Sequence, residues 1–170
     1  MSSLKLSDLV RAKLEKVRAL ILDVDGVMTS GTITYDNHGN ELKTFNVLDG
    51  YGIKAIQNAG ICVAIMSGRR SIAVERRALE LNISDVYQGL QNKTEALEKF
   101  ARLRELSYEE IAHIGDDIPD LALFEHVGLA VAVANAVPQL KETADLLLTR
   151  SGGEGAIREF SDLLLSVQRE

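Results

Sequence analysis

The chain has 170 residues, of which 46% are hydrophobic, a length and composition that suit one globular domain with its own core. It carries 19 Lys and Arg against 25 Asp and Glu, a formal net charge of −6, so a general nucleic-acid-binding surface is not expected. No apolar run approaches the roughly 18 residues that a membrane-spanning helix needs, and the N-terminus lacks a signal-peptide pattern. We therefore expect a cytoplasmic protein with no membrane partner, in which local cations bind any anionic ligand.

Apolar runs recur along the chain and alternate with segments of helical pattern. After a charged amphipathic segment at residues 6–16, we predict buried strands at residues 19–22, 61–66, 111–114 and 129–133. Helices are predicted at residues 51–59, 71–81, 93–106, 119–126, 137–142 and 154–167. Strands that alternate with helices are typical of βαβ units, so we expect an α/β fold with a Rossmann-like, doubly wound parallel sheet.

One insertion interrupts this alternation directly after the first strand. Residues 32–35 and 41–45 have strand character and flank a loop that contains Gly39, which is the pattern of a β-hairpin. The hairpin, at about residues 32–46, is attached where a cap over a site at the end of the first strand would lie. The sequence has no low-complexity segment, internal repeat or Pro/Ser-rich linker, and we expect residues 1–170 to form a single domain.

Two acidic residues follow the first predicted strand. The apolar run leads into Asp23-Val24-Asp25-Gly26, and because the chain leaves the sheet here, both carboxylates can point into the crevice beyond the strand. Two carboxylates at such a place indicate a hard divalent cation and phosphoryl chemistry. An EF-hand is excluded, since the twelfth position counted from Asp23 is Thr34 rather than the bidentate Glu which that loop requires.

Other polar groups follow, or lie near, the ends of later strands, and the ends of parallel strands meet in one crevice. These groups are Ser67-Gly68-Arg69, Lys93 and Gly115-Asp116-Asp117-Ile118-Pro119-Asp120. In such a crevice one carboxylate can attack a phosphoryl group, and a second acid can protonate the leaving oxygen and then deprotonate water. Because a phosphate repels a carboxylate, we expect Mg²⁺ to neutralise both, while Lys93 and the groups around Ser67 hold phosphate oxygens.

The ordered set DxDGVxT, SGR, a single Lys and GDDxxD resembles the haloacid dehalogenase-like phosphohydrolase superfamily. The resemblance implies that Asp23 is the nucleophile and a metal ligand. It also implies that Asp25 is the general acid/base and binds the metal through its backbone carbonyl. Asp116 would complete the Mg²⁺ site.

The same resemblance assigns the residues that would hold the phosphate and support the metal. Ser67, Gly68 and Lys93 would bind the phosphate of the substrate. Asp117 or Asp120 would support the site indirectly, by contacting either the metal-bound water or Lys93. The cofactor that this set implies is Mg²⁺, and the substrate is a small phosphate ester.

The similarity extends over nearly the whole chain to the 3-deoxy-D-manno-octulosonate 8-phosphate phosphatases of lipopolysaccharide synthesis. It is carried by the short hairpin cap and by residues 45–53, 87–89, 131–134 and 152–159. The resemblance implies a homotetramer whose hairpins form a central barrel and whose neighbouring subunits complete each active site. It implies that the substrate contacts Asp25, Asn46, Val47, Leu48, Asp49, Gly50, Lys54, Arg69 and Arg77.

The cations of this set have a physical reason. A sugar-acid phosphate carries both a carboxylate and a phosphate, so an acidic protein needs specific Arg and Lys contacts to bind it. Arg69 and Arg77 are eight residues apart, near two helical turns, and can share one face. Some family members carry Arg at the positions of Leu48, Lys54 and Glu154, where this chain lacks the planar guanidinium.

Other functions remain open. A phosphatase for a related nonulosonate 9-phosphate, or for another small sugar phosphate, is the nearest alternative. A receiver-type phosphorylation module also has a doubly wound sheet, but it is phosphorylated on an Asp at a middle strand, where this chain has Ser67. A homologue with a degraded site is not favoured, because the expected site residues are all present: Asp23, Asp25, Ser67, Lys93 and Asp116. The three histidines show no ligand spacing and receive no catalytic role.

Overall fold

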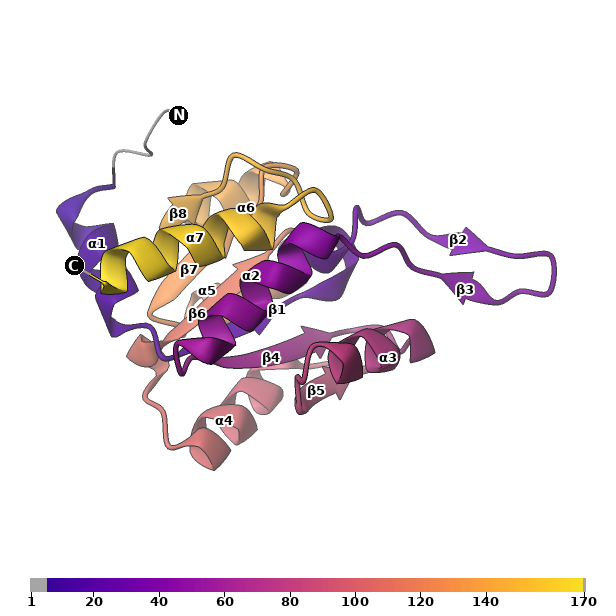
Figure 1. Ribbon diagram of the computed structural model, residues 1–170, viewed down its shortest axis with the longest axis horizontal. Coiled ribbons are helices and arrows are strands. Elements are labelled where there is room, and N and C mark those ends of the chain that lie inside the picture. Colours follow the sequence, from indigo (N-terminus) through magenta and orange to yellow (C-terminus); the bar gives the residue numbers. More distant parts are fainter. Residues whose placement is uncertain (1–5, 170) are drawn as a thin grey trace.

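A six-stranded parallel sheet lies at the centre of the structure (Figure 1), a computed structural model that describes residues 6–169. The strands are β1 Ala19–Leu22, β4 Cys62–Ser67, β5 Asp85–Gln88, β6 Ile111–Gly115, β7 Leu129–Ala132 and β8 Leu146–Leu147. They run in the order β5-β4-β1-β6-β7-β8, and each neighbouring pair is parallel. The expected α/β fold with a doubly wound parallel sheet is confirmed.

β1 occupies the middle of the sheet because its side chains are buried on both faces. All four of its residues, Ala19–Leu22, are 0% exposed, and it pairs with β4 on one side and β6 on the other. A strand of this kind has a continuous apolar run rather than an alternating pattern. Leu22 is aligned with Ile65 and Ile114, so Asp23, the next residue, leaves the sheet where all three strands come to their ends.

Helices cover both faces of the sheet. Their bounds are α1 Asp8–Lys16, α2 Val47–Asn58, α3 Ile72–Glu80, α4 Lys93–Arg104, α5 Leu121–Phe124, α6 Pro138–Thr143 and α7 Ala156–Gln168. The connections from β1 to β4 and β5 run in one direction and those from β6 to β7 and β8 in the other, so right-handed crossovers place their helices on opposite faces. α2 and α7 pack side by side (Figure 1). No helix of residues 6–169 is long and apolar enough to cross a membrane.

The insertion after β1 is a two-stranded hairpin that projects from the sheet and its helices (Figure 1). β2 Thr34–Tyr35 and β3 Glu41–Leu42 pair in antiparallel fashion. The carboxylate of Asp36 closes the turn by accepting the backbone N–H groups of His38 and Asn40 at 2.8 and 2.9 Å. The hairpin lies within the residues at which the sequence predicts one, and its strands are shorter than expected.

The four predicted strands are present, with ends that differ by at most one residue from the prediction. β5 and β8 were missed. Residues Asp85–Gln88 are all partly exposed at the edge of the sheet, so they lack the apolar run by which a buried strand is recognised. β8 has two residues, too few to show any period.

Two predicted helices differ most from the observed ones, while the others differ by at most two residues at either end. α2 begins at Val47 rather than at residue 51, because Asn46 caps it by accepting the N–H of Leu48 at 2.8 Å. The helix predicted at residues 119–126 is a 3₁₀ turn over Ile118–Asp120 followed by the single α-turn of α5. Pro119 is the second residue of this turn, and the Asp117 side chain caps it by accepting the N–H of Ile118 at 2.7 Å.

Candidate active site

An open cleft lies at the carboxyl ends of β1, β4 and β6, where ligands bind in open α/β sheets. Its volume is about 570 Å³. The predicted site residues that line it are Asp23, Asp25, Ser67, Gly68, Arg69, Lys93, Asp116, Asp117 and Asp120. The structure therefore brings together, in one cleft, the side chains that the sequence assigns to catalysis, metal binding and phosphate binding.

A tight turn after β1 presents the first two acids. Val24–Met28 form one wide helical turn, closed by a hydrogen bond from the N–H of Thr29 to the carbonyl of Val24 at 3.1 Å. Gly26 has φ +98°, and a Cβ placed on it would lie 1.9 Å from the carboxylate of Asp116. A glycine is required here both for the left-handed backbone and for the close approach of Asp116.

Two glycines from a distant part of the sequence, Gly152 and Gly153, pack against this turn. The N–H of Gly153 donates to the carbonyl of Val27 at 2.9 Å. A Cβ on Gly152 would lie 1.7 Å from the carbonyl oxygen of Gly26, so the two backbones touch. The loop that precedes α7 thus holds the turn that carries Asp25.

Lys93 joins two of the acids. It is the first residue of α4, behind an Asn92 cap, and its side chain is 7% exposed. Its ammonium donates to Asp23 and to Asp120, each at 2.6 Å. Burial lowers the pKa of Lys93, whereas the charges and hydrogen bonds of Asp23 and Asp120 raise it, and the net effect is a rise. The Lys93 ammonium therefore stays charged.

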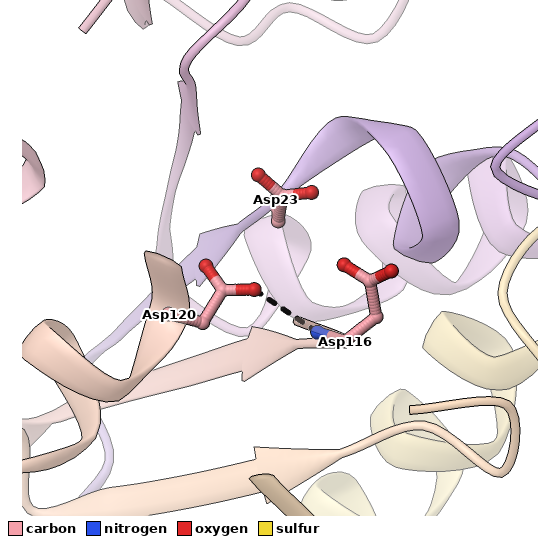
Figure 2. Close-up of side chains that lie close together, drawn as sticks. All are labelled: Asp23, Asp116 and Asp120. Atoms are coloured by element: carbon pink, nitrogen blue, oxygen red, sulfur yellow. Dashed lines mark hydrogen bonds between the residues drawn. The ribbon is translucent and has the colours of Figure 1, made fainter. Parts of the chain in front are cut away.

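Asp120 is held by the protein on both of its carboxylate oxygens. Oδ2 accepts the N–H of Asp116 at 3.0 Å (Figure 2). Oδ1 accepts from Lys93, and Oδ2 also accepts the N–H of Asp117 at 3.4 Å. Gly115 makes room for it, since a Cβ there would lie 2.6 Å from the Asp120 side chain. Of the two acids predicted to support Lys93, the geometry places Asp120 against it, while Asp117 caps the 3₁₀ turn.

The remaining carboxylates of the cleft repel one another. Burial raises the pKa of Asp23 to about 6, against the lowering effect of Lys93. Burial also raises the pKa of Asp116 to about 8, and the charges of Asp23 and Asp120 add to this rise. Within residues 6–169, no Lys, Arg or His forms an ion pair with the Asp116 carboxylate.

These acids suit a divalent cation. One oxygen each from Asp23, Asp116 and Asp120 lies within 4.8 Å of the other two, and Figure 2 shows the three side chains close together. Because Asp120 is engaged by protein donors, Asp23 and Asp116 are the ones left with oxygens for an ion. Mg²⁺ binds through one or two carboxylates plus phosphate oxygens and water, so the residues present fit it.

Asp25 is paired with cations, one of which the sequence analysis missed. The ammonium of Lys43 contacts the Asp25 carboxylate and lies 3.2 Å from Glu41, and the Lys43 side chain is 2% exposed. Arg69 lies 3.8 Å from Asp25 and donates to Glu41 at 2.6 Å. The alternation along β3 was the available signal, since Glu41 and Lys43 are two residues apart and so share one face.

Ser67 ends β4 at the floor of the cleft and is 3% exposed. Its hydroxyl accepts the N–H of Arg69 at 3.3 Å, and its carbonyl accepts the N–H of Leu90 at 3.1 Å. These bonds fix the turn after β4 in place. The Ser67 hydroxyl retains a proton that it can donate to an anion.

Several residues predicted for the sugar-acid pocket lie elsewhere in this chain. Asn46, Asp49, Gly50 and Arg77 line a small hollow of about 10 Å³ and not the acidic cleft. Arg77 donates to the carbonyl of Asn46 at 3.3 Å, and a Cβ on Gly50 would meet it at 2.4 Å. Asp49 is 3% exposed and accepts the N–H of Arg158 at 2.9 Å, so it caps α7.

Three further residues predicted for the pocket, Val47, Leu48 and Lys54, are on the outer surface of α2. Val47 and Leu48 are 81% and 47% exposed, and Lys54 is also exposed. Leu48 lines a separate surface hollow together with Arg150 and Arg158. In a single chain, these side chains and the acidic cleft therefore do not form one pocket.

His113 is a second polar residue of the site that sequence reasoning missed. It lies on β6 with 0% exposure, and its Nε2 is 2.9 Å from Asp120 Oδ1. His113 comes three residues before Asp116 in the sequence. In an apolar strand that is buried on both faces, the sequence does not indicate whether a single His points toward the site or into the core. His113 shows no metal-ligand spacing, and in the structure its two ring nitrogens contact a carboxylate and a carbonyl.

Known proteins are similar to this chain in sequence and in fold. Residues 78–160 match the family described as haloacid dehalogenase-like hydrolase. The 3-deoxy-D-manno-octulosonate 8-phosphate phosphatase KdsC of Escherichia coli strain K12 is 47% identical over 159 residues, which cover 94% of this chain and 85% of the relative. The chain belongs to the haloacid dehalogenase-like hydrolases. The relative from Yersinia pestis with the same description is 44% identical over 162 residues, covering 95% of this chain and 87% of that protein.

Solved structures of this family agree with the architecture. The crystal structure of 3-deoxy-D-manno-octulosonate 8-phosphate phosphatase from Yersinia pestis has a TM-score of 0.95 and 43% identity, covering 96% of this chain and 89% of that one. The enzyme from Moraxella catarrhalis, in complex with magnesium, phosphate and a KDO molecule, has a TM-score of 0.92 and 38% identity, covering 94% and 92%. The predicted resemblance to these hydrolases is confirmed.

Proposed function

We propose that the protein is a cytoplasmic, Mg²⁺-dependent phosphatase that hydrolyses 3-deoxy-D-manno-octulosonate 8-phosphate to KDO and phosphate in lipopolysaccharide biosynthesis. The observation that carries the proposal is the acidic cleft, in which Lys93 is paired with Asp23 beside Asp116. The 47% identity to enzymes of that name supports the choice of substrate.

In this proposal Asp23 attacks the phosphorus atom. A bond forms between its carboxylate oxygen and phosphorus, and the bond from phosphorus to the sugar oxygen breaks. Asp25 donates a proton to the departing oxygen, then accepts one from the water that attacks the aspartyl-phosphate and releases inorganic phosphate. Lys43 and Arg69 both lie next to the Asp25 carboxylate. Their charges support the proposal that this carboxylate is held at the mouth of the cleft.

Asp23 and Asp116 would hold Mg²⁺ with their side chains, and the backbone carbonyl of Asp25 would complete the protein ligands. When bound, the ion neutralises the repulsion between carboxylate and phosphate oxygens. Lys93 adds a fixed positive charge beside Asp23. The Ser67 hydroxyl and the backbone N–H groups after it bind phosphate oxygens.

We also propose that the active form is a homotetramer in which hairpins from neighbouring chains meet. Three apolar side chains of the hairpin support this, since Ile33, Tyr35 and Leu42 are 50%, 59% and 55% exposed. The position of Leu48 and Lys54 outside the cleft of their own chain agrees with a pocket shared between chains.

The test is a screen of phosphate release with eight-carbon and nine-carbon sugar-acid phosphates in the presence of Mg²⁺. We expect the eight-carbon acid to give the highest kcat/KM. A preference for a nonulosonate 9-phosphate would replace the substrate and keep the chemistry.

Two controls test the chemistry itself. Asp23→Asn should lower turnover by roughly 10⁴-fold or more, because it removes the nucleophile, whereas Asp8→Asn on the exposed start of α1 should leave it unchanged. EDTA should abolish activity and Mg²⁺ should restore it. Turnover by the Asp23→Asn variant, or without metal, would exclude the proposed mechanism.

A further inference from the structure

His113 is buried in the sheet in contact with two oxygen acceptors. Its Nδ1 lies 3.2 Å from the carbonyl of Ile21 on β1, and its Nε2 lies 2.9 Å from Asp120 Oδ1. The ring packs edge-on against Phe124, at 5.7 Å between centroids. A carboxylate and a carbonyl only accept hydrogen bonds, so each of these contacts requires a proton on the ring nitrogen that makes it, and the contact with Asp120 requires one on Nε2.

Asp120 is the link between His113 and the reacting groups. The same oxygen, Oδ1, accepts from His113 and from Lys93, while Oδ2 accepts the N–H of Asp116. The Asp120 side chain is 2% exposed, so water does not replace a donor that is lost. Burial alone raises the pKa of Asp120, but the hydrogen bond and charge of His113, together with those of Lys93, lower it below its ordinary value.

The position of Lys93 depends on that carboxylate. Its ammonium lies between Asp23 and Asp120 at 2.6 Å from each, and its side chain is 7% exposed. If Asp120 turned away, Lys93 would keep one acidic partner and would move toward Asp23, the proposed nucleophile. The direction of one buried carboxylate therefore decides how much positive charge faces the phosphate.

We propose that His113 is a positioning residue, whose Nε2–H holds Asp120 in the orientation that keeps Lys93 shared between Asp120 and Asp23 instead of paired with Asp23 alone. The residue itself touches neither substrate nor metal, and it acts through Asp120 and Lys93. This inference rests on the proposed phosphatase function for its effect on turnover, but the contact on which it depends is a property of the protein without substrate.

Two substitutions separate this role from simple packing. The amide nitrogen of Gln in His113→Gln can reach the place of Nε2 and donate to Asp120. The shorter Asn in His113→Asn places its amide near Nδ1, where it donates to Ile21 and not to Asp120. Both variants remove the ring and its contact with Phe124. Asn leaves a cavity that is larger by one methylene group, so the melting temperature of each variant is compared with its activity.

We expect His113→Asn to lower kcat/KM by about 10- to 100-fold, the usual effect of losing a group that orients a ligand or catalytic side chain, while His113→Gln stays within a few-fold of wild type. The inhibition constant of orthovanadate, which imitates the phosphoryl group in transfer, should rise in His113→Asn by a similar factor. Equal activity of the two variants, or losses that follow their melting temperatures, would overturn the proposal.

NMR gives readouts that need no turnover. In wild type labelled with ¹⁵N-histidine, Nε2 of His113 should carry a proton, and a bare Nε2 would overturn the proposal even if His113→Asn did not fold. The ammonium signal of Lys93 should be protected from exchange in wild type and His113→Gln and lost in His113→Asn. If wild type released no phosphate from any ester, the proposed function would fail, while these spectra would still decide the role of His113.

Discussion

Asp116 binds its proton more tightly in the folded protein than in the unfolded chain, because burial and nearby carboxylates raise its pKa from 3.8 to about 8. Between these pH values the unfolded carboxylate has lost its proton and the folded one has kept it. Its contribution to the free energy of unfolding of the magnesium-free protein therefore falls as the pH rises from about 4 to about 8. Asp23, with its pKa raised to about 6, acts in the same direction over the lower part of this range.

Urea unfolding in EDTA, at several pH values between about 5 and about 8, measures this effect as the difference between wild type and Asp116→Asn. We expect Asp116→Asn to gain stability relative to wild type as the pH rises. Added Mg²⁺ should stabilise wild type most at the higher pH, because the ion binds the deprotonated carboxylates. A difference that stays constant with pH would contradict the state assigned to Asp116.

At the residue scale, the sequence predicted the acids of the cleft because each follows a buried strand at a recognisable turn. Lys43 and His113 were missed for a physical reason. Each acts by pairing with an acid on another element of the structure, Asp25 or Asp120, and such a pair has no periodic pattern in the sequence. Asp49, which the resemblance places in the substrate pocket, is buried and accepts the N–H of Arg158 at the start of α7.

At the scale of elements, the hairpin is tied to the site through the residues next to β3. Lys43 contacts Asp25, the proposed proton donor, and its removal would leave Asp25 facing Glu41 with only Arg69 between them. We expect Lys43→Met to reduce turnover of sugar phosphates, within the roughly 10²- to 10⁴-fold that general acid–base catalysis contributes. The loss arises because a misplaced Asp25 protonates the sugar oxygen less well.

An aryl phosphate provides the measurement, because its leaving group departs without a proton. Lys43→Met should lose much less activity on p-nitrophenyl phosphate than on the sugar phosphate. Lys16→Met, at a side chain 61% exposed on α1, is the matched control and should behave as wild type on both. Equal losses on the two substrates would mean that Lys43 does not act through Asp25.

The elements predicted well are those whose burial leaves a mark in the sequence. β1 and β4 are buried and apolar, so their bounds were predicted within one residue. The start of α2 was missed because Asn46 caps a helix whose first turn, Val47 and Leu48, is exposed and gives no amphipathic pattern. The hairpin strands were overestimated, since only two residues of each form the ladder.

At the scale of the whole molecule, the proposed homotetramer is tested by sedimentation together with activity. We expect the protein to sediment at four times the 18.6 kDa mass of the chain. Leu42→Lys, which places a charge on an exposed apolar side chain of the hairpin, should dissociate it and reduce turnover. A wild-type monomer with full activity would exclude a site shared between chains.

The contact between Gly152 and Gly26 has a consequence for the time at which the protein becomes active. The turn that carries Asp25 is synthesised early, but its backbone is enclosed only when residues 152 and 153 dock on it. Closing a loop of this length is slow compared with local helix formation. A nascent chain that already contains every catalytic acid should therefore stay inactive until this loop has also emerged from the ribosome.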